Sequence, residues 1–170
     1  MSQKQFAYSI DQFKKIAQQT IKTAKRLGAS AAEVDLNEGL GSAVSVRKGE
    51  TENLEYNRDK GLGVTVYVGH RKGFASTSDL GEKAISDTVE AAVAIAQLTA
   101  EDPFSGLADP NQLAKDIVEL DLYHPWDISM DESIGLAREC EQAAFDVSPE
   151  IKNSEGARAS AQERQFVTAK

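Results

Sequence analysis

The chain has 170 residues, with 19 Lys and Arg, 27 Asp and Glu and two His, which gives a formal net charge of −8. A single cysteine, Cys140, excludes an intramolecular disulfide, and no run approaches the roughly 18 apolar residues that cross a bilayer. An acidic chain also disfavours nucleic acid, whose binding depends on neutralising phosphates. We therefore expect a soluble cytoplasmic protein with no membrane and no nucleic-acid partner.

The charge is distributed unevenly along the chain. Residues 1–30 carry six basic residues against one acidic residue, whereas residues 101–155 carry 14 acidic residues against three basic ones. The two segments either pair across an interface or face each other within the fold. The N-terminal basic residues fall on the polar side of a predicted helix, which favours a solvated face over a nucleic-acid site. These residues are Lys4, Lys14, Lys15, Lys22, Lys25 and Arg26.

The first predicted helix covers residues 10–27. Its apolar residues recur at the helical period, Ser9 and Gln12 form a capping-box pattern, and Gly28 suits the left-handed position after a helix. The stripe consists of Phe13, Ile16, Ala17, Thr20, Ile21, Ala24 and Leu27.

From residue 31 to 78 the apolar period changes from 3.6 to 2, which is typical of half-buried strands. Glycines 39 and 41 and the segments 48–50, 57–61 and 69–73 are expected to be turns between them. Such short connections join antiparallel neighbours, so this region is predicted to be a meander of four or five strands. The strands are expected near residues 34–36, 44–46, 54–56, 62–68 and 74–78.

Two further helices are predicted. One is capped by Asp79 with Glu82, runs to about Ala100, and is apolar nearly all round in its second half, so we expect it to cover the sheet. The other begins at Ser129 with a capping box to Glu132 and ends before Pro149, with an apolar stripe of Leu136, Cys140, Ala143 and Val147. Between them, three prolines indicate a loop, in which residues 112–120 hold a helical turn or a short strand.

These elements predict an α+β fold in which an antiparallel sheet of four to five strands is covered by helices. The order is helix, meander, helix, loop and helix. Residues 1–148 are expected to form this domain. Residues 149–170 are expected to open a second, β-rich domain, since a strand begins near Gln165 without a visible partner.

No residue is predicted to bind a metal. His70 and His124 are far apart in the sequence, and Cys140 is the lone cysteine, whereas a zinc site needs three or four ligands. His70 is expected to be a solvated turn residue and His124 to pack beside Trp126. Cys140 lies on an apolar helix stripe, so we expect a buried, inert thiol.

No catalytic or cofactor-binding residue is predicted either. The carboxylate pairs Asp116/Glu119 and Glu139/Glu141 are expected to be ordinary solvated acids. The glycines Gly61 and Gly63 lack the third glycine and the following helix of a dinucleotide-binding loop. They are expected to end a turn and to allow close backbone approach in the sheet.

Four stretches resemble the N-terminal domain of the TldD/PmbA family of cytoplasmic metallopeptidases. They are Val44-Ser-Val-Arg-Lys-Gly-Glu-Thr-Glu52, the run from Asn57 to Leu80, Asp102-Pro-Phe-Ser-Gly-Leu-Ala-Asp109 and Ile151-Lys-Asn-Ser-Glu-Gly-Ala157. The resemblance runs through essentially the whole chain and is strongest to the PmbA, or TldE, branch.

The resemblance implies a subunit of a two-component protease. In the family, a TldD-type subunit carries a His-Glu-x-x-x-His metal site, which is expected to bind zinc, whereas PmbA-type subunits generally lack those ligands. The pair degrades unfolded peptides, matures a peptide-antibiotic precursor and turns over an antitoxin. The implied partners are a TldD-type subunit, an extended or unfolded peptide and, as a further possibility, a second copy of the chain.

Two functions remain open at this point. The chain is either the N-terminal part of such a subunit, serving assembly or substrate enclosure, or a non-catalytic binding or regulatory module, in line with the family's older label as a modulator of DNA gyrase. In the first case the sheet of residues 31–78 would line a chamber or hold an extended peptide by strand addition. No metal or other cofactor is expected within this chain.

Overall fold

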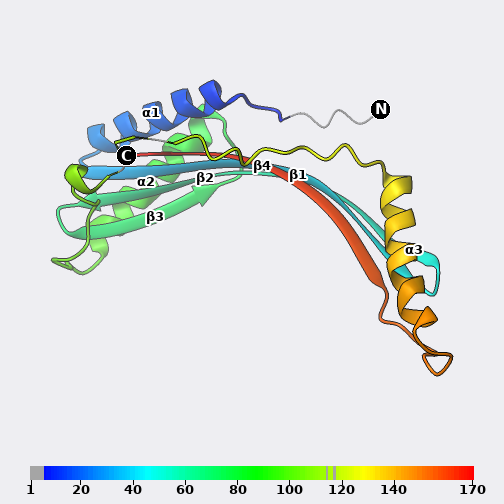
Figure 1. Cartoon of the computed structure of the whole chain (residues 1–170). Coiled ribbons are helices and arrows are strands. Elements are labelled where there is room, and N and C mark those ends of the chain that lie inside the picture. The colour runs from blue at the N-terminus through cyan, green and yellow to red at the C-terminus, as the bar shows by residue number, and fades with distance from the viewer. Residues whose placement is uncertain (1–5, 114, 117) are drawn as a thin grey trace. The chain divides into compact units, whose positions relative to one another are not determined.

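The computed structural model describes residues 6–113, 115–116 and 118–170; Lys4 therefore lies outside the described residues. Its helices are α1 (Ile10–Arg26), α2 (Glu82–Leu98) and α3 (Met130–Asp146), with a short 3₁₀ helix, η1, at Pro110–Gln112. The strands are β1 (Ala31–Arg47), β2 (Glu50–Val68), β3 (Arg71–Thr77) and β4 (Ala157–Ala169), arranged in the order β3-β2-β1-β4 (Figure 1). The predicted α+β class with an antiparallel sheet is confirmed. No helix of the described residues is long and apolar enough to span a membrane.

The strands are fewer and longer than predicted. The expected turns at Gly39–Gly41 and at residues 57–61 do not form, because β1 and β2 continue through them. Gly41 shows one physical reason: a Cβ there would lie 2.9 Å from the carbonyl oxygen of Ala161 and from Cγ of Gln162. The glycine therefore allows β4 to approach β1 closely and does not mark a turn.

The turn at Lys48-Gly49 is confirmed. Both residues have positive φ, 52° and 76°, as a two-residue hairpin turn requires. A second two-residue turn, at Gly69-His70, leads into β3, which pairs antiparallel with β2 from Leu62↔Thr77 to Val68↔Arg71.

The fold divides into two compact units. The first contains Met1–Glu38, Asp59–Leu120 and Arg164–Lys170, and the second contains Gly39–Arg58 and Asp121–Glu163. The strands β1, β2 and β4 each contribute residues to both units.

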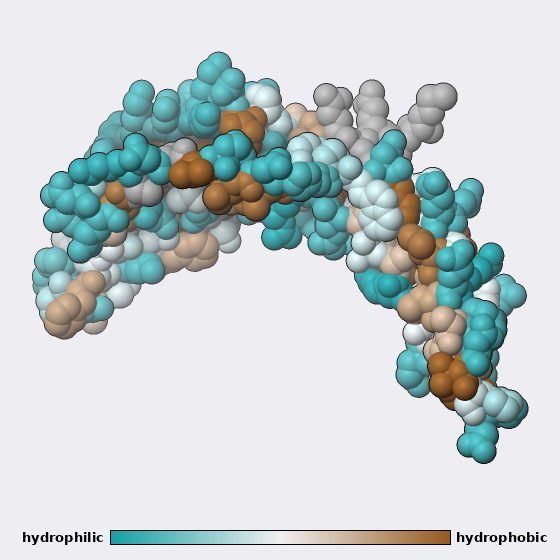
Figure 2. Space-filling model, in the orientation of Figure 1, coloured by the Kyte–Doolittle hydropathy of each residue, from teal (hydrophilic) through white to brown (hydrophobic). Residues whose placement is uncertain are grey.

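The first unit has its core between α1, α2 and one face of the sheet. The predicted stripe of α1 is buried at Phe13, Ala17 and Ile21, and the capping box of Ser9 with Gln12 is present. The α1 lysines at 14, 15, 22 and 25 are exposed, and the surface over this helix is mostly hydrophilic in Figure 2. The buried strand residues alternate as predicted: Ala32, Val34, Leu36, Leu62, Val64 and Val66.

Helix α2 covers the apolar face as predicted, but two details differ. Its N-cap is Gly81, because the Asp79 carboxylate instead accepts the Gly81 N–H at 2.8 Å in a local turn. The helix is also not covered all round: Ile95 is 45% and Leu98 89% exposed. The helix lies directly against β3, where a Cβ at Gly73 would overlap the carbonyl oxygen of Ala92.

The second unit has a smaller core, in which α3 packs on β1 and β4. It contains Val44, Val46 and Ala137, with Met130, Ile134, Ala157 and Ala159 around them. The capping box of Ser129 with Glu132 is confirmed. Strand β4 begins earlier than the predicted strand near Gln165 and lies beside β1 in the sheet. The division of the chain at residue 148 stays a prediction.

Candidate functional site

The histidines and the cysteine lie at exposed positions. His70 is in the β2–β3 turn, with Nδ1 3.1 Å from the carbonyl oxygen of Ser105, and His124 has Nε2 2.6 Å from that of Asp121. Cys140 is an exposed free thiol on α3. Within the part of the chain that the structure describes, no group of three or more His, Cys, Asp and Glu residues is placed to hold a metal ion.

The predicted burial of Cys140 is wrong because α3 turns a different face to the sheet. The helix buries Ser133, Ala137 and Glu141, which follow one another at intervals of four residues. The small side chains of Ser133 and Ala137 allow the helix to lie close to β1. The predicted stripe consequently faces outward, and Val147 at its end is 78% exposed.

The predicted acid pairs behave differently from one another. Asp116, Glu119 and Glu139 are exposed, as expected of solvated acids. Glu141 is only 3% exposed, so its predicted solvation is wrong. Its burial depends on partners more than 90 positions earlier in the chain, which the local sequence does not reveal.

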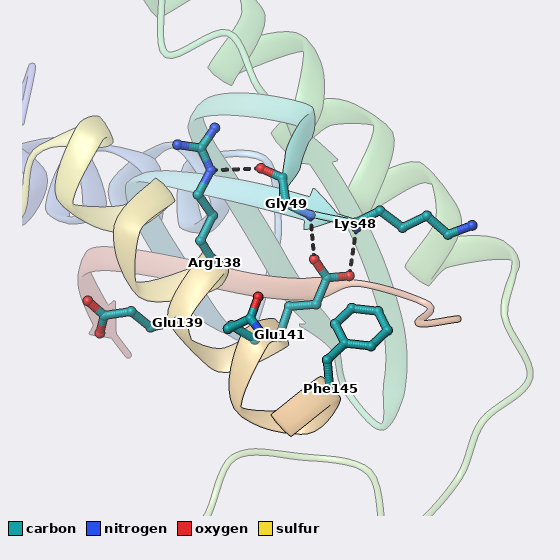
Figure 3. A pocket seen from close by; sticks show the side chains of 7 residues that line it. Lys48, Gly49, Arg138, Glu139, Glu141 and Phe145 are labelled. Atoms are coloured by element: carbon teal, nitrogen blue, oxygen red, sulfur yellow. Dashed lines mark hydrogen bonds between the residues drawn. The ribbon is translucent and has the colours of Figure 1, made fainter. Parts of the chain in front are cut away.

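The Glu141 carboxylate binds the backbone of the β1–β2 turn (Figure 3). One oxygen accepts the N–H of Lys48 and the other that of Gly49, both at 2.8 Å, while Arg138 donates from Nε to the Gly49 carbonyl oxygen at 2.8 Å. The hydrogen bond from Gly49 is the main cause that lowers the pKa of Glu141, helped by the bond from Lys48 and opposed by burial. Three hydrogen bonds thus fix α3 to the turn.

An open pocket of about 520 Å³ lies beside this contact. In Figure 3 the side chains of Lys48 and Arg138 extend away from one another, so the two cations do not converge on one anion. Both oxygens of Glu141 are held by the turn, which leaves the carboxylate poorly placed to accept a proton from a substrate. This arrangement positions α3 on the β1–β2 turn. The pocket is lined by Lys48, Gly49, Arg138, Glu139, Glu141, Gln142 and Phe145.

A second buried carboxylate, Glu38, lies at the end of the first unit's part of β1. It is fully buried and accepts the N–H groups of Ala7 at 2.8 Å and Tyr8 at 3.2 Å. Gln165 of β4 donates to the same carboxylate at 3.2 Å and to the Tyr8 carbonyl oxygen at 2.7 Å. Glu38 is not among the residues predicted from the sequence, although it occupies the next core-facing position after Val34 and Leu36. It connects β4 to the segment before α1.

The sheet face opposite α1 and α2 in the first unit carries two exposed aromatic residues, Phe74 on β3 and Phe166 on β4. Gly63 lies within β2, and a Cβ there would lie 3.1 Å from the ring of Phe74, which occupies the space above the glycine. The predicted close backbone approach at Gly63 is therefore wrong, because the group that approaches is a side chain. Phe74 is 53% exposed, and on β1 of the same unit Asp35 accepts a hydrogen bond from Thr168 at 2.6 Å. We call this surface the outer face.

Comparisons with known proteins agree with the fold and the motifs. The family described as PmbA/TldA metallopeptidase domain 1 matches residues 32–96. Metalloprotease PmbA of Escherichia coli O157:H7 is 46% identical over 146 residues, which cover 84% of this chain and 32% of the relative. The Metalloprotease PmbA homolog of Haemophilus influenzae is 47% identical over 137 residues, covering 81% and 30%. The chain therefore spans about a third of the length of these curated relatives.

Solved structures share the fold at lower identity. TldE from Thermococcus kodakarensis matches with a TM-score of 0.66 and 16% identity, over 91% of this chain and 35% of that one. A putative modulator of DNA gyrase from Bacteroides thetaiotaomicron matches with a TM-score of 0.71 and 23% identity, over 94% of this chain and 36% of that one.

Proposed function

Since the chain belongs to the TldD/PmbA metallopeptidase family, we propose that it is the N-terminal part of a PmbA-type subunit of a cytoplasmic protease that degrades or matures unstructured peptides. In this proposal the chain serves assembly or substrate enclosure, and a TldD-type partner subunit supplies the metal and the hydrolysis. The observation that carries it is the 46% identity to a metalloprotease PmbA over 84% of the chain. The buried carboxylates of Glu38 and Glu141 support the non-catalytic role in this proposal. Each accepts hydrogen bonds from backbone N–H groups and so stabilises the fold.

The outer face is the surface that we propose for substrate enclosure. Phe74 presents an exposed ring that lies over Gly63. An exposed aromatic ring on a sheet face suits an extended peptide of mixed sequence, because the contact does not depend on one particular peptide side chain.

The experiment combines the full-length subunit that contains this chain with a TldD-type partner, and measures both co-purification and cleavage of an unstructured peptide. Association with cleavage above the level of the partner alone is expected. If the full-length subunit neither associates nor raises cleavage, the proposal fails and the non-catalytic binding module becomes the better hypothesis.

A matched pair of variants tests the outer face within that assay. Phe74→Ala removes the exposed ring, and Leu98→Ala removes an exposed apolar side chain from α2, on the helix side of the same unit. We expect Phe74→Ala to raise the peptide KM and Leu98→Ala to leave it unchanged. Equal effects of the two changes would remove the outer face from the proposal while leaving the subunit assignment in place.

A further inference from the structure

The outward face of α3 carries an apolar stripe. Its side chains lie at helical intervals of three and four residues, and all are exposed in the part of the chain that the structure describes. The helix already buries another face, which contains Ser133, Ala137 and Glu141, so packing within the second unit does not account for this stripe. An apolar stripe of this spacing is the pattern by which one helix packs on another. The stripe consists of Leu136, Cys140, Ala143 and, at the C-cap, Val147.

A pocket of about 400 Å³ opens at the start of the stripe. Trp126, Ile128 and Leu136 supply its apolar lining, and Leu136 belongs to the stripe as well. At Gly135, which also lines the pocket, a Cβ would have no neighbour within 4 Å, so the space above the helix backbone is open. A pocket of this kind suits one large apolar side chain of a partner, and such anchors supply much of the binding energy of an interface.

Carboxylates follow one side of the stripe. Glu132, Glu139 and Asp146 are exposed and lie seven residues apart, which is just under two helical turns, so they form a row along the helix. Glu139 also lines the pocket. Asp146 accepts a hydrogen bond from the Gln142 amide at 2.7 Å, and this neutral donor leaves the charge of the carboxylate in place.

The basic residue of α3 does not neutralise this row. Arg138 instead donates from Nε to the Gly49 carbonyl oxygen at 2.8 Å, on the turn between β1 and β2. The surface beside the stripe is therefore negative, and its charge restricts which partner can cover the stripe.

Of the possible partners, the charges favour a basic one. A second copy that presented the same face would bring like charges together, which is costly at an interface. Nucleic acid and anionic lipid are repelled for the same reason. An amphipathic helix with Lys or Arg beside its apolar residues is complementary to both the stripe and the row of carboxylates.

We propose that the outward face of α3 is a docking surface for a basic amphipathic helix of another polypeptide. A large apolar side chain of that helix enters the pocket beside Trp126, and its basic residues lie against Glu139 and Asp146. Recognition depends on apolar side chains and on carboxylate charge, neither of which is used up by hydrogen bonds to neutral groups within the chain. This docking surface is independent of the proposed protease function.

Trp126 allows binding to be measured directly in the 170-residue chain, because it is the one tryptophan of the sequence and lines the pocket. The probe is a synthetic peptide of 17 residues, the length of α3, with leucines at intervals of three and four, lysines on both sides of them and no aromatic residue. The control peptide has glutamate in place of every lysine. We expect the lysine peptide to change the Trp126 fluorescence saturably, with a dissociation constant about tenfold or more below that of the glutamate peptide.

Variants of the chain test the two parts of the surface. Glu139→Lys combined with Asp146→Lys should reverse the preference between the two peptides. Leu136→Gln removes an apolar side chain from both the stripe and the pocket, and it should weaken binding of the lysine peptide about tenfold. Leu98→Gln is the matched control, because it changes an exposed leucine on α2, and it should leave binding unchanged. Thermal melting of each variant establishes that it is folded.

Cys140 provides an independent test, since it is the single cysteine of the sequence and is exposed within the stripe. A bulky maleimide on Cys140 should block binding of the lysine peptide. Unchanged binding by the labelled chain, equal binding of the two peptides, or no change of Trp126 fluorescence with either would overturn the proposal. Dimerisation that Leu136→Gln abolishes, or tighter binding to neutral phosphatidylcholine vesicles than to the lysine peptide, would also overturn it, because the occupant would then be a second copy or lipid.

Discussion

The contact between α2 and β3 at Gly73 gives the sharpest stability prediction. A Cβ at this position would overlap the carbonyl oxygen of Ala92, lie 2.6 Å from the backbone nitrogen of Ala96 and lie 3.0 Å from its Cβ. The atoms in the way belong mainly to the backbone of a helix, so no side-chain rotation can make room. Gly73→Ala must therefore move α2 away from the sheet and loosen the core beneath it.

The expected cost follows from two opposing effects. Overpacking of a well-packed core costs about 1–3 kcal/mol, and the rigid backbone at Gly73 favours the upper end. Alanine also lowers the conformational entropy of the unfolded chain, which by itself would stabilise the folded state by about 0.4–1 kcal/mol. We expect a net loss of about 2 kcal/mol in the free energy of unfolding, which lowers the Tm of a chain of this length by roughly 4–8 °C.

Urea denaturation and thermal melting followed by circular dichroism measure this loss. The matched control is Gly135→Ala in α3, where a new Cβ has no neighbour within 4 Å. That change should stabilise the chain by about 0.5–1 kcal/mol, because alanine is the better residue in a helix. If Gly73→Ala proves as stable as wild type, the close packing of α2 on β3 is refuted.

Three further predictions concern the carboxylates and the cysteine. The lowered pKa of Glu141 means that its contribution to folding is complete above the ordinary value of 4.5 and is lost as the pH falls through the folded-state value. Glu141→Gln should therefore flatten the acid side of the pH–stability curve, and a curve of unchanged shape would count against the carboxylate. Glu38→Ala removes the acceptor of the Ala7 and Tyr8 N–H groups, and it should lower the free energy of unfolding by about 2–4 kcal/mol in urea titrations; stability equal to wild type would show that these bonds contribute little. Cys140 should react with a thiol reagent at one equivalent per chain without denaturant, whereas protection until unfolding would contradict its exposure.

Local signals predicted the helices and the face of the sheet that is buried. The capping boxes at Ser9 and Ser129 and the alternation of Leu62, Val64 and Val66 depend only on neighbouring residues, and all are confirmed. The long strands could not be predicted in this way, because sheet pairing overrides the turn preference of the glycines. Gly41 illustrates this, since the atoms that require a glycine belong to β4, about 120 positions later.

The burial of the two carboxylates at the candidate site, Glu38 and Glu141, also could not be predicted from neighbouring residues alone. Burial was predicted from apolar character, which assigns a glutamate to solvent. Glu141 is buried because the backbone N–H groups of a distant turn bind both of its oxygens, and no local pattern contains that turn. Glu38 could have been suspected, since it continues the core-facing phase of Val34 and Leu36, but the groups that bind it come from the two ends of the chain.

The uninterrupted course of β1 has a consequence for how the length of the chain can vary in evolution. Its core-facing residues enter one core at Val34 and Leu36 and the other at Val44 and Val46. A single inserted or deleted residue between Leu36 and Val44 would turn one of the two sets to the opposite face, because side chains alternate with a period of two. We therefore expect related chains to gain or lose residues at the hairpin turns and in the loop before α3, and to keep the length of this strand constant.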